Sequence, residues 1–475
     1  MSTLDRRTFV WSLAAAGAMA ATAARATPGR ATAARPGRGG GPANDRPNII
    51  FIMADDLGYA DLSCTGSHHI RTPAIDSIAN GGIHLRQGYS STPICSPTRT
   101  ALLTGCYAQR FDIGLEEPLG PTAPPGIGVP FDRPTLASVL KALGYHTKLV
   151  GKWHLGDPPV HGPLQHGYDE FLGIVEGAAD YFRHQMVMGG REVGVGLARG
   201  NDPIETAGYL TDLFGDEAVR SIESAGENPL YLALHFNAPH WPWESREDAA
   251  LAPTIGSSFH YDGGNLATYR AMVEAMDQNV AKVLEALDRA GKADNTIIVF
   301  TSDNGGERFS ETWPFTGQKG EVLEGGIRVP LLVRWPRRIP AGSHSEQVMA
   351  SMDFLPTLLA MAGGTPSSAG QFDGLDLSAQ LTGSAAPIER TLFWRFKASE
   401  QAAVRQGDWK YVRLGGKEHL FNLAQDERER AERGQAEPER LRAMRSLWDG
   451  WNRQMLPYRV DGYSEALRNA YPDRY

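Results

Sequence analysis

The segment Asn-Ile-Ile-Phe-Ile-Met-Ala-Asp-Asp, residues 48–56, decides the fold class. Its apolar run is rich in β-branched residues and too short for a helix, which favours a buried strand of a parallel sheet. Similar apolar runs recur at 147–150, 230–236, 296–301 and 329–333. Because helical patterns separate these runs, the sequence predicts an α/β fold in which helices sandwich a large, mostly parallel sheet.

The character of the chain changes after about residue 365. Short apolar stretches there predict a small antiparallel sheet, at 392–395, 403–404, 409–412 and 420–422. Charged helical sequence follows at 426–451. We therefore expect a larger domain over residues 46–365 and a smaller C-terminal α+β domain over residues 366–475.

The first 46 residues differ from the rest in charge. The chain of 475 residues carries a formal charge of −8, yet residues 1–46 hold seven Arg and two Asp without Lys or Glu, so the remainder sums to −13. An acidic body argues against a nucleic-acid partner, because that affinity comes from Lys and Arg neutralising phosphates. A small anionic substrate remains compatible, because a local pocket can be basic. No apolar run reaches membrane-spanning length, which predicts no stable membrane span.

Residues 1–26 are typical of an export signal. Arg6 and Arg7 precede the short apolar stretch 11–24, an arrangement that resembles a twin-arginine signal. The alternative is an ordinary secretory signal with two chance arginines. In both cases we expect an exported protein, periplasmic or secreted, and in the first its partner is the twin-arginine export machinery. Residues 27–45, rich in Ala, Arg, Gly and Pro, predict a disordered linker.

Polar residues gather just after the predicted strands. Taken singly, an Asp-Asp or Asp-Asn-Gly sequence is commonly a turn. Ligands of open α/β sheets, however, bind beyond the carboxyl ends of the strands, so the joint pattern predicts a site. Its members are Asp55 and Asp56 after the first strand, Lys152 and His154 after the second, His240 after the third, and Asp303 and Asn304 after the fourth.

Four of these residues offer only oxygen donors. They are Asp55, Asp56, Asp303 and Asn304. Oxygen-rich sites dominated by carboxylates suit Ca²⁺ better than Zn²⁺, which favours His and Cys. The sequence therefore predicts a site for a hard cation, Ca²⁺ or alternatively Mg²⁺.

The segment that begins at Cys95 predicts a helix, with Cys95 at its N-terminus. Pro97 suits the first turn, and the apolar residues 101–103 continue the helix. The side chain at position 95 would lie beside free backbone N–H groups that favour anions, and Arg99 would point the same way. The alternative is a small buried thiol ahead of a capped helix.

Cys-Ser-Pro-Thr-Arg-Thr-Ala-Leu-Leu-Thr-Gly, residues 95–105, resembles the signature of type I sulfatases, arylsulfatase-like members of the alkaline-phosphatase-like superfamily. Residues 144–154 resemble the second signature of that family. Further motifs match in order, at 301–306, 319–330, 407–410 and 420–423. The likeness covers most of the chain from Arg46 onward, and it implies that residues 46–365 are a catalytic sulfatase domain.

The resemblance implies a modified active site. A separate formylglycine-generating maturation enzyme would oxidise Cys95 to formylglycine. That group would bind the metal together with Asp55, Asp56, Asp303 and Asn304. If Cys95 is consumed in this way, the remaining cysteines at positions 64 and 106 either pair after export or stay as thiols.

The resemblance also implies a role for each cation and histidine. Arg99 and Lys152 would polarise and hold the formylglycine, and His154 would act as the base during release. His240 and Lys319 would bind the sulfate oxygens, and one of them would protonate the leaving oxygen. In the family one hydroxyl of the aldehyde hydrate attacks sulfur, and the second, deprotonated by His154, frees sulfate. A metal and cations aimed at the sulfate oxygens would stabilise the developing charge.

The expected substrate is a sulfated small molecule or saccharide. Trp241 and Trp243 beside His240 fit a sugar lying on aromatic faces, or they merely pack the loop. Simple aryl sulfates are alternative substrates, and a formylglycine-dependent phosphonate or phosphodiester hydrolase is an alternative activity. If the chain were a non-catalytic relative, some of the site residues would be replaced, whereas every motif residue is present. Cys106 stands where relatives often carry a basic residue, so we expect the edge of the site to differ there.

Overall fold

The computed structural model describes residues 45–121, 123, 126–260, 263–462, 464 and 468, which belong to one compact unit. The predicted export signal and nearly all of the predicted linker lie outside the described residues. Within these residues, no helix has both the length and the apolar character that crossing a membrane requires.

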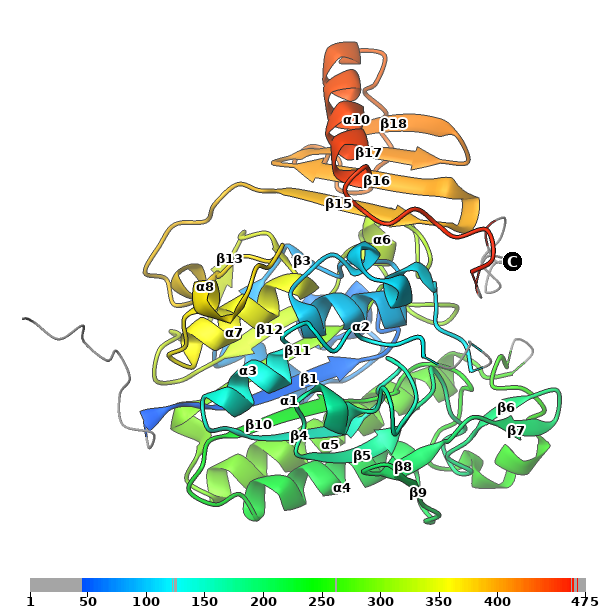
Figure 1. The fold of residues 1–475 in the computed structure, drawn as a ribbon, viewed down its shortest axis with the longest axis vertical. Helices are drawn as coiled ribbons and strands as arrows, with labels where there is room; N and C mark the ends of the chain where they lie inside the picture. Colours follow the sequence, from blue (N-terminus) through cyan, green and yellow to red (C-terminus); the bar gives the residue numbers. More distant parts are fainter. Residues whose placement is uncertain are drawn as a thin grey trace, which may run out of the picture. The chain divides into compact units, whose positions relative to one another are not determined.

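A ten-stranded sheet organises the larger part of the chain (Figure 1), in the order β13-β2-β12-β11-β1-β10-β4-β5-β8-β9. Its five middle strands run parallel, and they are β11 (Thr296–Ser302), β1 (Asn48–Ala54), β10 (Leu230–His235), β4 (His146–Gly151) and β5 (Glu170–Ile174). The prediction of a mostly parallel sheet is confirmed. The run at 329–333 was expected to be parallel, but it forms β12 (Leu331–Arg334) antiparallel to β11. The connection from β11 to β12 contains the short helix α6 (Glu324–Ile327).

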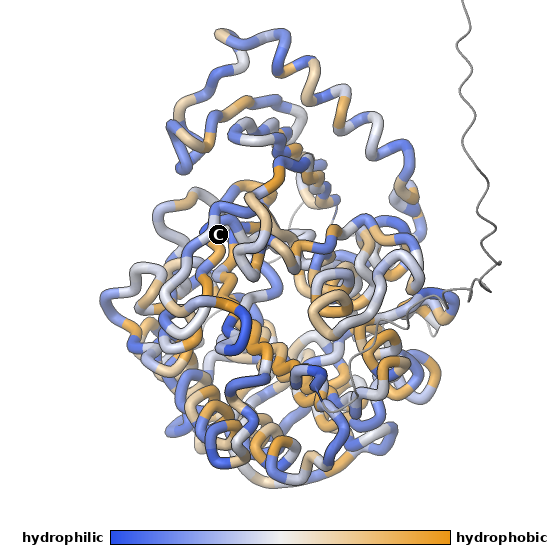
Figure 2. The backbone as a smooth tube through the Cα atoms, turned by 90° about the vertical axis from the view of Figure 1, so that its left-hand side faces the viewer, coloured by the Kyte–Doolittle hydropathy of each residue, from blue (hydrophilic) through white to orange (hydrophobic). Residues whose placement is uncertain are grey.

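Helices cover both faces of this sheet, which explains why β1 is apolar along its whole length. Ile49, Phe51 and Met53 pack into one core with α2 (Cys95–Thr104), α3 (Leu136–Ala142) and α7 (Phe354–Met361). The alternate residues Ile50, Ile52 and Ala54 pack into a second core with α1 (Pro73–Asn80), α4 (Leu210–Glu223) and α5 (Leu266–Arg289). In Figure 2 the hydrophobic, orange stretches lie mainly toward the middle of the view and the hydrophilic, blue stretches mainly along its outline. Side chains of a strand alternate between its faces, so a strand with two covered faces needs apolar residues throughout.

Shorter elements complete the larger part. A parallel pair joins β3 to β14, and a hairpin joins β6 to β7. The remaining strands are β2 (Ile83–Leu85), β3 (Gly88–Tyr89), β6 (Met186–Met188), β7 (Arg191–Val193), β8 (Leu197–Arg199), β9 (Asp202–Pro203), β13 (Ser343–Ser345) and β14 (Met349–Ala350). The short helices are α6 (Glu324–Ile327), α8 (Pro366–Ala369) and α9 (Ser378–Leu381).

The C-terminal region is the expected antiparallel sheet with a helix. Its strands are β15 (Thr391–Phe396), β16 (Gln401–Gln406), β17 (Trp409–Leu414) and β18 (Lys417–Asn422), and α10 (Pro438–Asn452) packs on one face. The predicted helix was wrong at its start, because α10 begins twelve residues after Asp426. The Asp426 carboxylate accepts the amides of Arg430 (2.6 Å) and Ala431 (2.5 Å), which folds that segment into a local turn. The domain boundary at 365/366 stays a prediction.

A buried ion network joins the other face of the C-terminal sheet to the larger part of the chain. Lys410 of β17 lies 2.8 Å from both Glu324 of α6 and Glu429, and all three side chains are at most 6 % exposed. Arg328 donates twice more to Glu324, at 2.8 and 2.5 Å, and Tyr89 donates to the same carboxylate at 2.7 Å. We call these five residues the interlock. The motif residues at 324, 328 and 410 therefore hold two sheets together and lie outside the catalytic constellation.

Candidate active site

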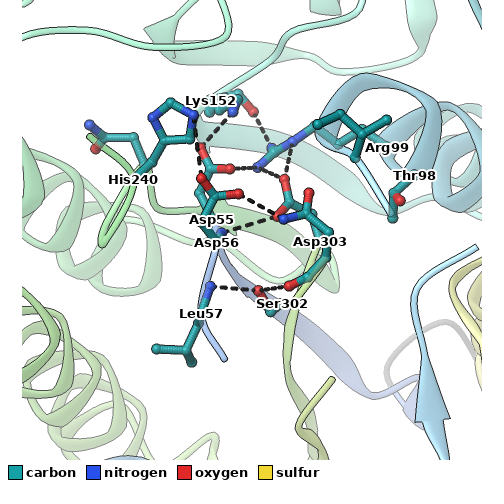
Figure 3. A network of polar contacts seen from close by, with 12 residues as sticks. Asp55, Asp56, Leu57, Thr98, Arg99, Lys152, His240, Ser302 and Asp303 are labelled. Atoms are coloured by element: carbon teal, nitrogen blue, oxygen red, sulfur yellow. Dashed lines mark hydrogen bonds and ion pairs between the residues drawn. The ribbon is translucent and has the colours of Figure 1, made fainter. Parts of the chain in front are cut away.

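The carboxyl ends of four neighbouring strands carry the polar residues expected there. Asp303 follows β11, Asp56 follows β1, His240 follows β10 and Lys152 follows β4. The helix α2 adds Cys95 and Arg99, and the loop after β11 adds Lys319. All ten residues proposed from the sequence are at most 4 % exposed. Figure 3 shows the two adjacent aspartates between Lys152, His240 and Asp303, with Arg99 reaching across from α2.

Three cations face three carboxylates at this point. Lys152 donates to Asp55 at 2.5 Å, and Lys319 donates to Asp56 at 2.6 Å. Arg99 donates to Asp303 through two nitrogens, at 3.1 and 2.9 Å, and to the Lys152 carbonyl at 3.1 Å. Fully buried charges persist only when they are paired, so each cation fixes the position of a carboxylate.

The pKa values of the carboxylates follow their surroundings. Burial raises the pKa of Asp55, but Lys152 and then Arg99 outweigh burial and hold that pKa below its ordinary value. Burial raises the pKa of Asp56 well above its ordinary value in spite of Lys319, and burial and the neighbouring Asp55 raise the pKa of Asp303. Burial therefore outweighs the nearby cations at Asp56 and Asp303, and a bound cation would stabilise both carboxylates in their charged form.

Four ligand atoms lie within 4.8 Å of one another, one each from Asp55, Asp56, Cys95 and His240. Two oxygens of the site are buried and accept no hydrogen bond among the described residues, Asp55 Oδ1 and Asn304 Oδ1. The Asn304 amide donates to Asp56 at 2.7 Å, so Asn304 is in direct contact with the cluster. These donors suit a metal ion, and most of them are oxygens.

Two details differ from the predicted ligand set. His240 lies in the cluster with its Nε2 3.5 Å from Asp56 Oδ2, although no metal role was assigned to it. One oxygen of Asp303 is taken by Arg99, and the other accepts the backbone amide of Asp56 at 3.3 Å. Asp303 therefore also orients the segment that carries Asp56, which has an unusual φ of 64°.

Cys95 is the first residue of α2 and is 2 % exposed. Burial raises the pKa of its thiol, although Lys152 and Lys319 act in the opposite direction. Thiolates are the reactive form of cysteine, so the unmodified side chain is a neutral, weak nucleophile.

His154 has one ring nitrogen that makes no hydrogen bond among the described residues. Its Nε2 donates to the Leu119 carbonyl at 2.6 Å, and its Nδ1 is buried and unpartnered among the described residues. Burial lowers the pKa of His154 well below its ordinary value, and Lys152 lowers it further. A Cβ added at Gly177 would lie 2.4 Å from the imidazole, so that glycine is needed for the ring to fit.

His240 is oriented by its own loop. Its Nδ1 donates to the Trp241 carbonyl at 2.6 Å, which turns Nε2 toward Asp56. Both tryptophans of this loop are buried, Trp241 at 6 % and Trp243 at 2 % exposure. Lys319 lies 5.5 Å above the Trp241 ring, and Trp243 packs on Phe309. The two indoles therefore pack the loop, which was the alternative to their stacking against a sugar.

Glu307 is a residue of the site that the sequence analysis missed. Its carboxylate lies 2.8 Å from Lys319 and accepts the indole N–H of Trp241. It thus ties the Lys319 loop to the His240 loop. In the sequence, the feature that could have indicated Glu307 is its position, four residues after Asp303 in the glycine-rich segment that follows β11.

The two other cysteines are free thiols in the structure. The Cys64 amide donates to Asp76 at 3.0 Å, and the Cys106 thiol donates to the Gln371 carbonyl at 3.7 Å. Of the two alternatives for this pair, the structure therefore has the unpaired one.

Comparisons with known proteins agree with this geometry. Residues 47–364 match the family described as Sulfatase, and residues 318–435 match the family described as N-sulphoglucosamine sulphohydrolase, C-terminal. The second match spans the segment that carries the interlock, with Glu324, Arg328, Lys410 and Glu429.

Curated relatives and solved structures cover most of the chain. It is 32% identical over 447 residues to steryl-sulfatase of Mus musculus, covering 77% of this chain and 70% of the relative. It is 34% identical over 402 residues to N-acetylgalactosamine-6-sulfatase of Canis lupus familiaris, covering 79% and 73%. The solved structure of Ps i-CgsB in complex with k-i-k-neocarrahexaose matches with a TM-score of 0.79 and 31% identity, covering 89% of this chain and 96% of that chain. The chain therefore belongs to the sulfatase family and is a sulfuric ester hydrolase.

Proposed function

We propose that this enzyme hydrolyses sulfate esters of carbohydrates, with Cys95 converted to formylglycine and Ca²⁺ held beside it. The observation that carries the proposal is the convergence of Cys95 with Asp55, Asp56 and His240, whose ligand atoms lie within 4.8 Å of one another. A buried neutral thiol among carboxylates is a poor nucleophile and a poor ligand for a hard cation. An oxygen group at the same position suits both tasks.

Formylglycine would supply, through its hydrate, a hydroxyl nucleophile and a hydroxyl that allows release. Arg99 and Lys152 would hold that group, because both lie next to Cys95 and are themselves fixed by carboxylates at 2.9 and 2.5 Å. Their rigid pairing keeps two positive charges aimed at the nucleophile without reorganisation during the reaction.

The cation would be held by Asp55, Asp56, Asp303 and Asn304 together with the group at position 95. It would draw negative charge from the sulfate oxygens. One oxygen each of Asp55 and Asn304 is buried without accepting a hydrogen bond among the described residues, which supports this assignment. The predominance of oxygen donors favours Ca²⁺, with Mg²⁺ as the alternative.

His154 would take the proton in the release step. Its Nε2–H is fixed on the Leu119 carbonyl at 2.6 Å, so Nδ1 carries the lone pair that accepts a proton. His240 and Lys319 would contact the sulfate and leaving oxygens, and one of them would donate a proton. Lys319 is held at 2.6 Å by Asp56 and at 2.8 Å by Glu307, which places its ammonium beside the reaction centre.

A carbohydrate substrate is supported by the relatives. N-acetylgalactosamine-6-sulfatase is 34% identical to this chain, and the solved structure at 31% identity is a complex with a neocarrahexaose. Simple aryl sulfates are the second candidate substrates, because steryl-sulfatase, 32% identical, is named for a non-carbohydrate ester. A phosphonate monoester hydrolase of Agrobacterium radiobacter shares the fold at 21% identity and a TM-score of 0.62.

The test is sulfate release from a panel of sulfated saccharides and one aryl sulfate. The enzyme would be co-produced with a formylglycine-generating enzyme and supplied with Ca²⁺, and Cys95→Ala would be the control. We expect release by the processed enzyme alone, with saccharides preferred. No release from any saccharide, with the aldehyde at position 95 verified by mass spectrometry, would refute the carbohydrate assignment.

We also propose export through the twin-arginine machinery, on the basis of Arg6 and Arg7 ahead of a short apolar stretch. Replacing both by lysine is expected to retain the protein in the cytoplasm. Unchanged export of that variant would favour the ordinary secretory route.

A further inference from the structure

The segment that follows β5 holds no predicted site residue, yet it lies against both histidines of the active site. The Val175 carbonyl accepts the His154 amide at 3.0 Å, and Gly177 leaves room for the His154 imidazole. Further along the same segment, Tyr181 reaches the backbone that carries His240. A strand without a catalytic residue of its own therefore supports residues that follow two other strands.

Residues 237–241 follow β10 and form a turn, which we call the His240 turn. The His240 amide donates to the Asn237 carbonyl at 2.9 Å, and His240 Nδ1 donates to the Trp241 carbonyl at 2.6 Å. The imidazole is thus hydrogen-bonded to the backbone of its own turn. Its direction toward Asp56, 3.5 Å away, therefore depends on the orientation of the whole turn.

A single hydroxyl group holds two points of the His240 turn. Tyr181 is fully buried, and its hydroxyl oxygen lies 2.9 Å from the carbonyl oxygens of both Asn237 and His240. A tyrosine has one hydroxyl proton, so the two carbonyls share it. Among the described residues, this hydroxyl is the only hydrogen-bond donor to the His240 carbonyl. Its loss would leave a buried carbonyl without a partner, which folded proteins avoid.

Contacts on three sides fix the position of the Tyr181 hydroxyl. The Tyr181 amide donates to the Glu244 carboxylate at 2.9 Å, and the Tyr181 carbonyl accepts the Leu210 amide at 2.9 Å, at the start of α4. The Tyr181 ring packs on the Tyr209 ring, with 5.3 Å between their centroids. Burial raises the pKa of the Tyr181 hydroxyl well above its ordinary value, so the hydroxyl remains a donor.

The His240 turn also reaches the second candidate proton donor of the site. The Trp241 indole donates to Glu307, whose carboxylate lies 2.8 Å from Lys319. A shift of the turn therefore displaces His240 directly and Lys319 through Glu307. Proton transfer needs donor and acceptor within about 2.6–3.2 Å of each other, so either donor loses efficiency when the turn moves.

We propose that Tyr181 is a positioning residue, which holds the His240 turn where the leaving oxygen can receive a proton. The proposal rests on the proposed function, in which His240 or Lys319 donates that proton. As the S–O bond breaks, its electron pair goes to the leaving oxygen, and the proton passes from the donor to the same oxygen. Tyr181 keeps its own proton throughout.

The dependence of the rate on the leaving group separates this role from a general loss of structure. A strongly basic leaving oxygen needs the proton, whereas a weakly basic one departs largely without it. The test uses two pairs of esters: a sulfated saccharide with its analogue that carries fluorine beside the sulfated carbon, and phenyl sulfate with para-nitrophenyl sulfate. In each pair the second alcohol is the more acidic. A saccharide sulfatase and an aryl sulfatase are therefore both measurable.

The variants are Tyr181→Phe and Tyr145→Phe, in the full chain processed to formylglycine and supplied with Ca²⁺. Tyr145 is the matched control, because its buried hydroxyl also donates to a backbone carbonyl, that of Pro47, at 2.7 Å. Tyr145 and Pro47 precede β4 and β1, at the amino ends of strands whose carboxyl ends carry the site. Both variants lose the same kind of hydrogen bond, but only one of them loses it at the His240 turn.

Tyr181→Phe is expected to lower kcat/KM about 30-fold for the more basic leaving group of a pair and about threefold for the less basic one. This difference is only part of the roughly 10²- to 10⁴-fold contribution of general acid catalysis, because the donor is displaced and not removed. Tyr145→Phe should leave the ratio within a pair unchanged. Because both esters of a pair are measured on one sample of protein, the folded fraction cancels from the ratio.

Two results would overturn the proposal. Equal losses within a pair would show that Tyr181 acts on all esters alike, for example through the Asp55 amide, which donates to the Ala238 carbonyl of the His240 turn at 3.1 Å. An unchanged kcat/KM would show that the hydroxyl is not needed. Either result leaves the proposed function intact when the parent releases sulfate, whereas a parent that hydrolyses none of the esters contradicts the proposed function itself.

Discussion

Replacing Lys410 with methionine tests whether the interlock holds the C-terminal sheet onto the larger part of the chain. Lys410 is fully buried and lies 2.8 Å from both Glu324 and Glu429. Methionine fills a similar volume without the charge. Removing one partner of a buried ion pair costs about 3–5 kcal/mol, because the opposite charge stays in a medium of low dielectric constant.

The cost is expected to fall on one carboxylate more than on the other. Arg328 keeps two hydrogen bonds to Glu324, at 2.8 and 2.5 Å, whereas Glu429 loses its cation. We therefore expect the lower end of the range, about 3 kcal/mol at pH 8. An unfolding entropy of about 2.1 cal/mol/K per residue over about 430 residues converts this into a decrease in Tm of about 3–4 °C.

The pKa of Glu429 determines how the loss of Tm in Lys410→Met changes with pH. Burial already raises the pKa of Glu429 to about 7, and loss of Lys410 raises it further. A carboxyl whose pKa is higher in the folded than in the unfolded state binds a proton on folding, so its penalty is absent at low pH and appears as the pH rises. The difference in Tm between Lys410→Met and the parent should be small at pH 5 and full at pH 8.

Calorimetric unfolding at both pH values is the assay. A second variant, Lys410→Met with Glu429→Gln, removes the uncompensated charge and is expected to recover at least half of the lost Tm at pH 8. Three results would refute the reasoning: parental stability of the single variant, an equal loss at both pH values, or no recovery in the double variant.

Three further changes test the active site. Gly177→Ala is expected to lower kcat about 10- to 100-fold, because the added methyl group displaces the His154 imidazole. The control is Gly226→Ala, which has no atom within 4 Å of the added Cβ and should leave kcat unchanged. Equal kcat values for the two variants would contradict the steric argument. Glu307→Gln keeps an acceptor for the Trp241 indole but removes the negative charge 2.8 Å from Lys319. We therefore expect kcat/KM to fall about tenfold, with Tm within about 1 °C of the parent. An unchanged kcat/KM would show that the carboxylate does not position the lysine. Removal of divalent cations with a chelator should lower sulfate release at least about 100-fold, with recovery on adding Ca²⁺ or Mg²⁺; full release after verified metal removal would exclude a catalytic cation.

Much of the active site could be predicted because its residues come directly after strands. Asp55, Lys152, His240 and Asp303 all follow apolar runs whose parallel pairing was itself predictable from composition. Once those strands are neighbours, their carboxyl ends must meet. The sequence pattern therefore predicted both the sheet and the edge of the sheet at which the active-site residues lie.

Other features depend on contacts that leave no local pattern. The antiparallel direction of β12 depends on its pairing with β11, and a short apolar run carries no direction. Glu307 belongs to the site through its contacts with Lys319 and with Trp241, which lies 66 residues away in sequence. The start of α10 was missed because Asp426 competes for backbone amides that a helix would otherwise use.

The central position of β1 has a consequence for synthesis. Its two neighbours are β10 and β11, so Ile49 finds its first sheet partner, Tyr231, about 180 residues later. At about 5–20 residues per second, a ribosome needs roughly 10–40 seconds to deliver that partner. During this interval the seven-residue apolar strand has two unpaired edges, the condition that promotes aggregation. The first strand of the fold to be made therefore stays without its sheet neighbours until residue 235 has been made.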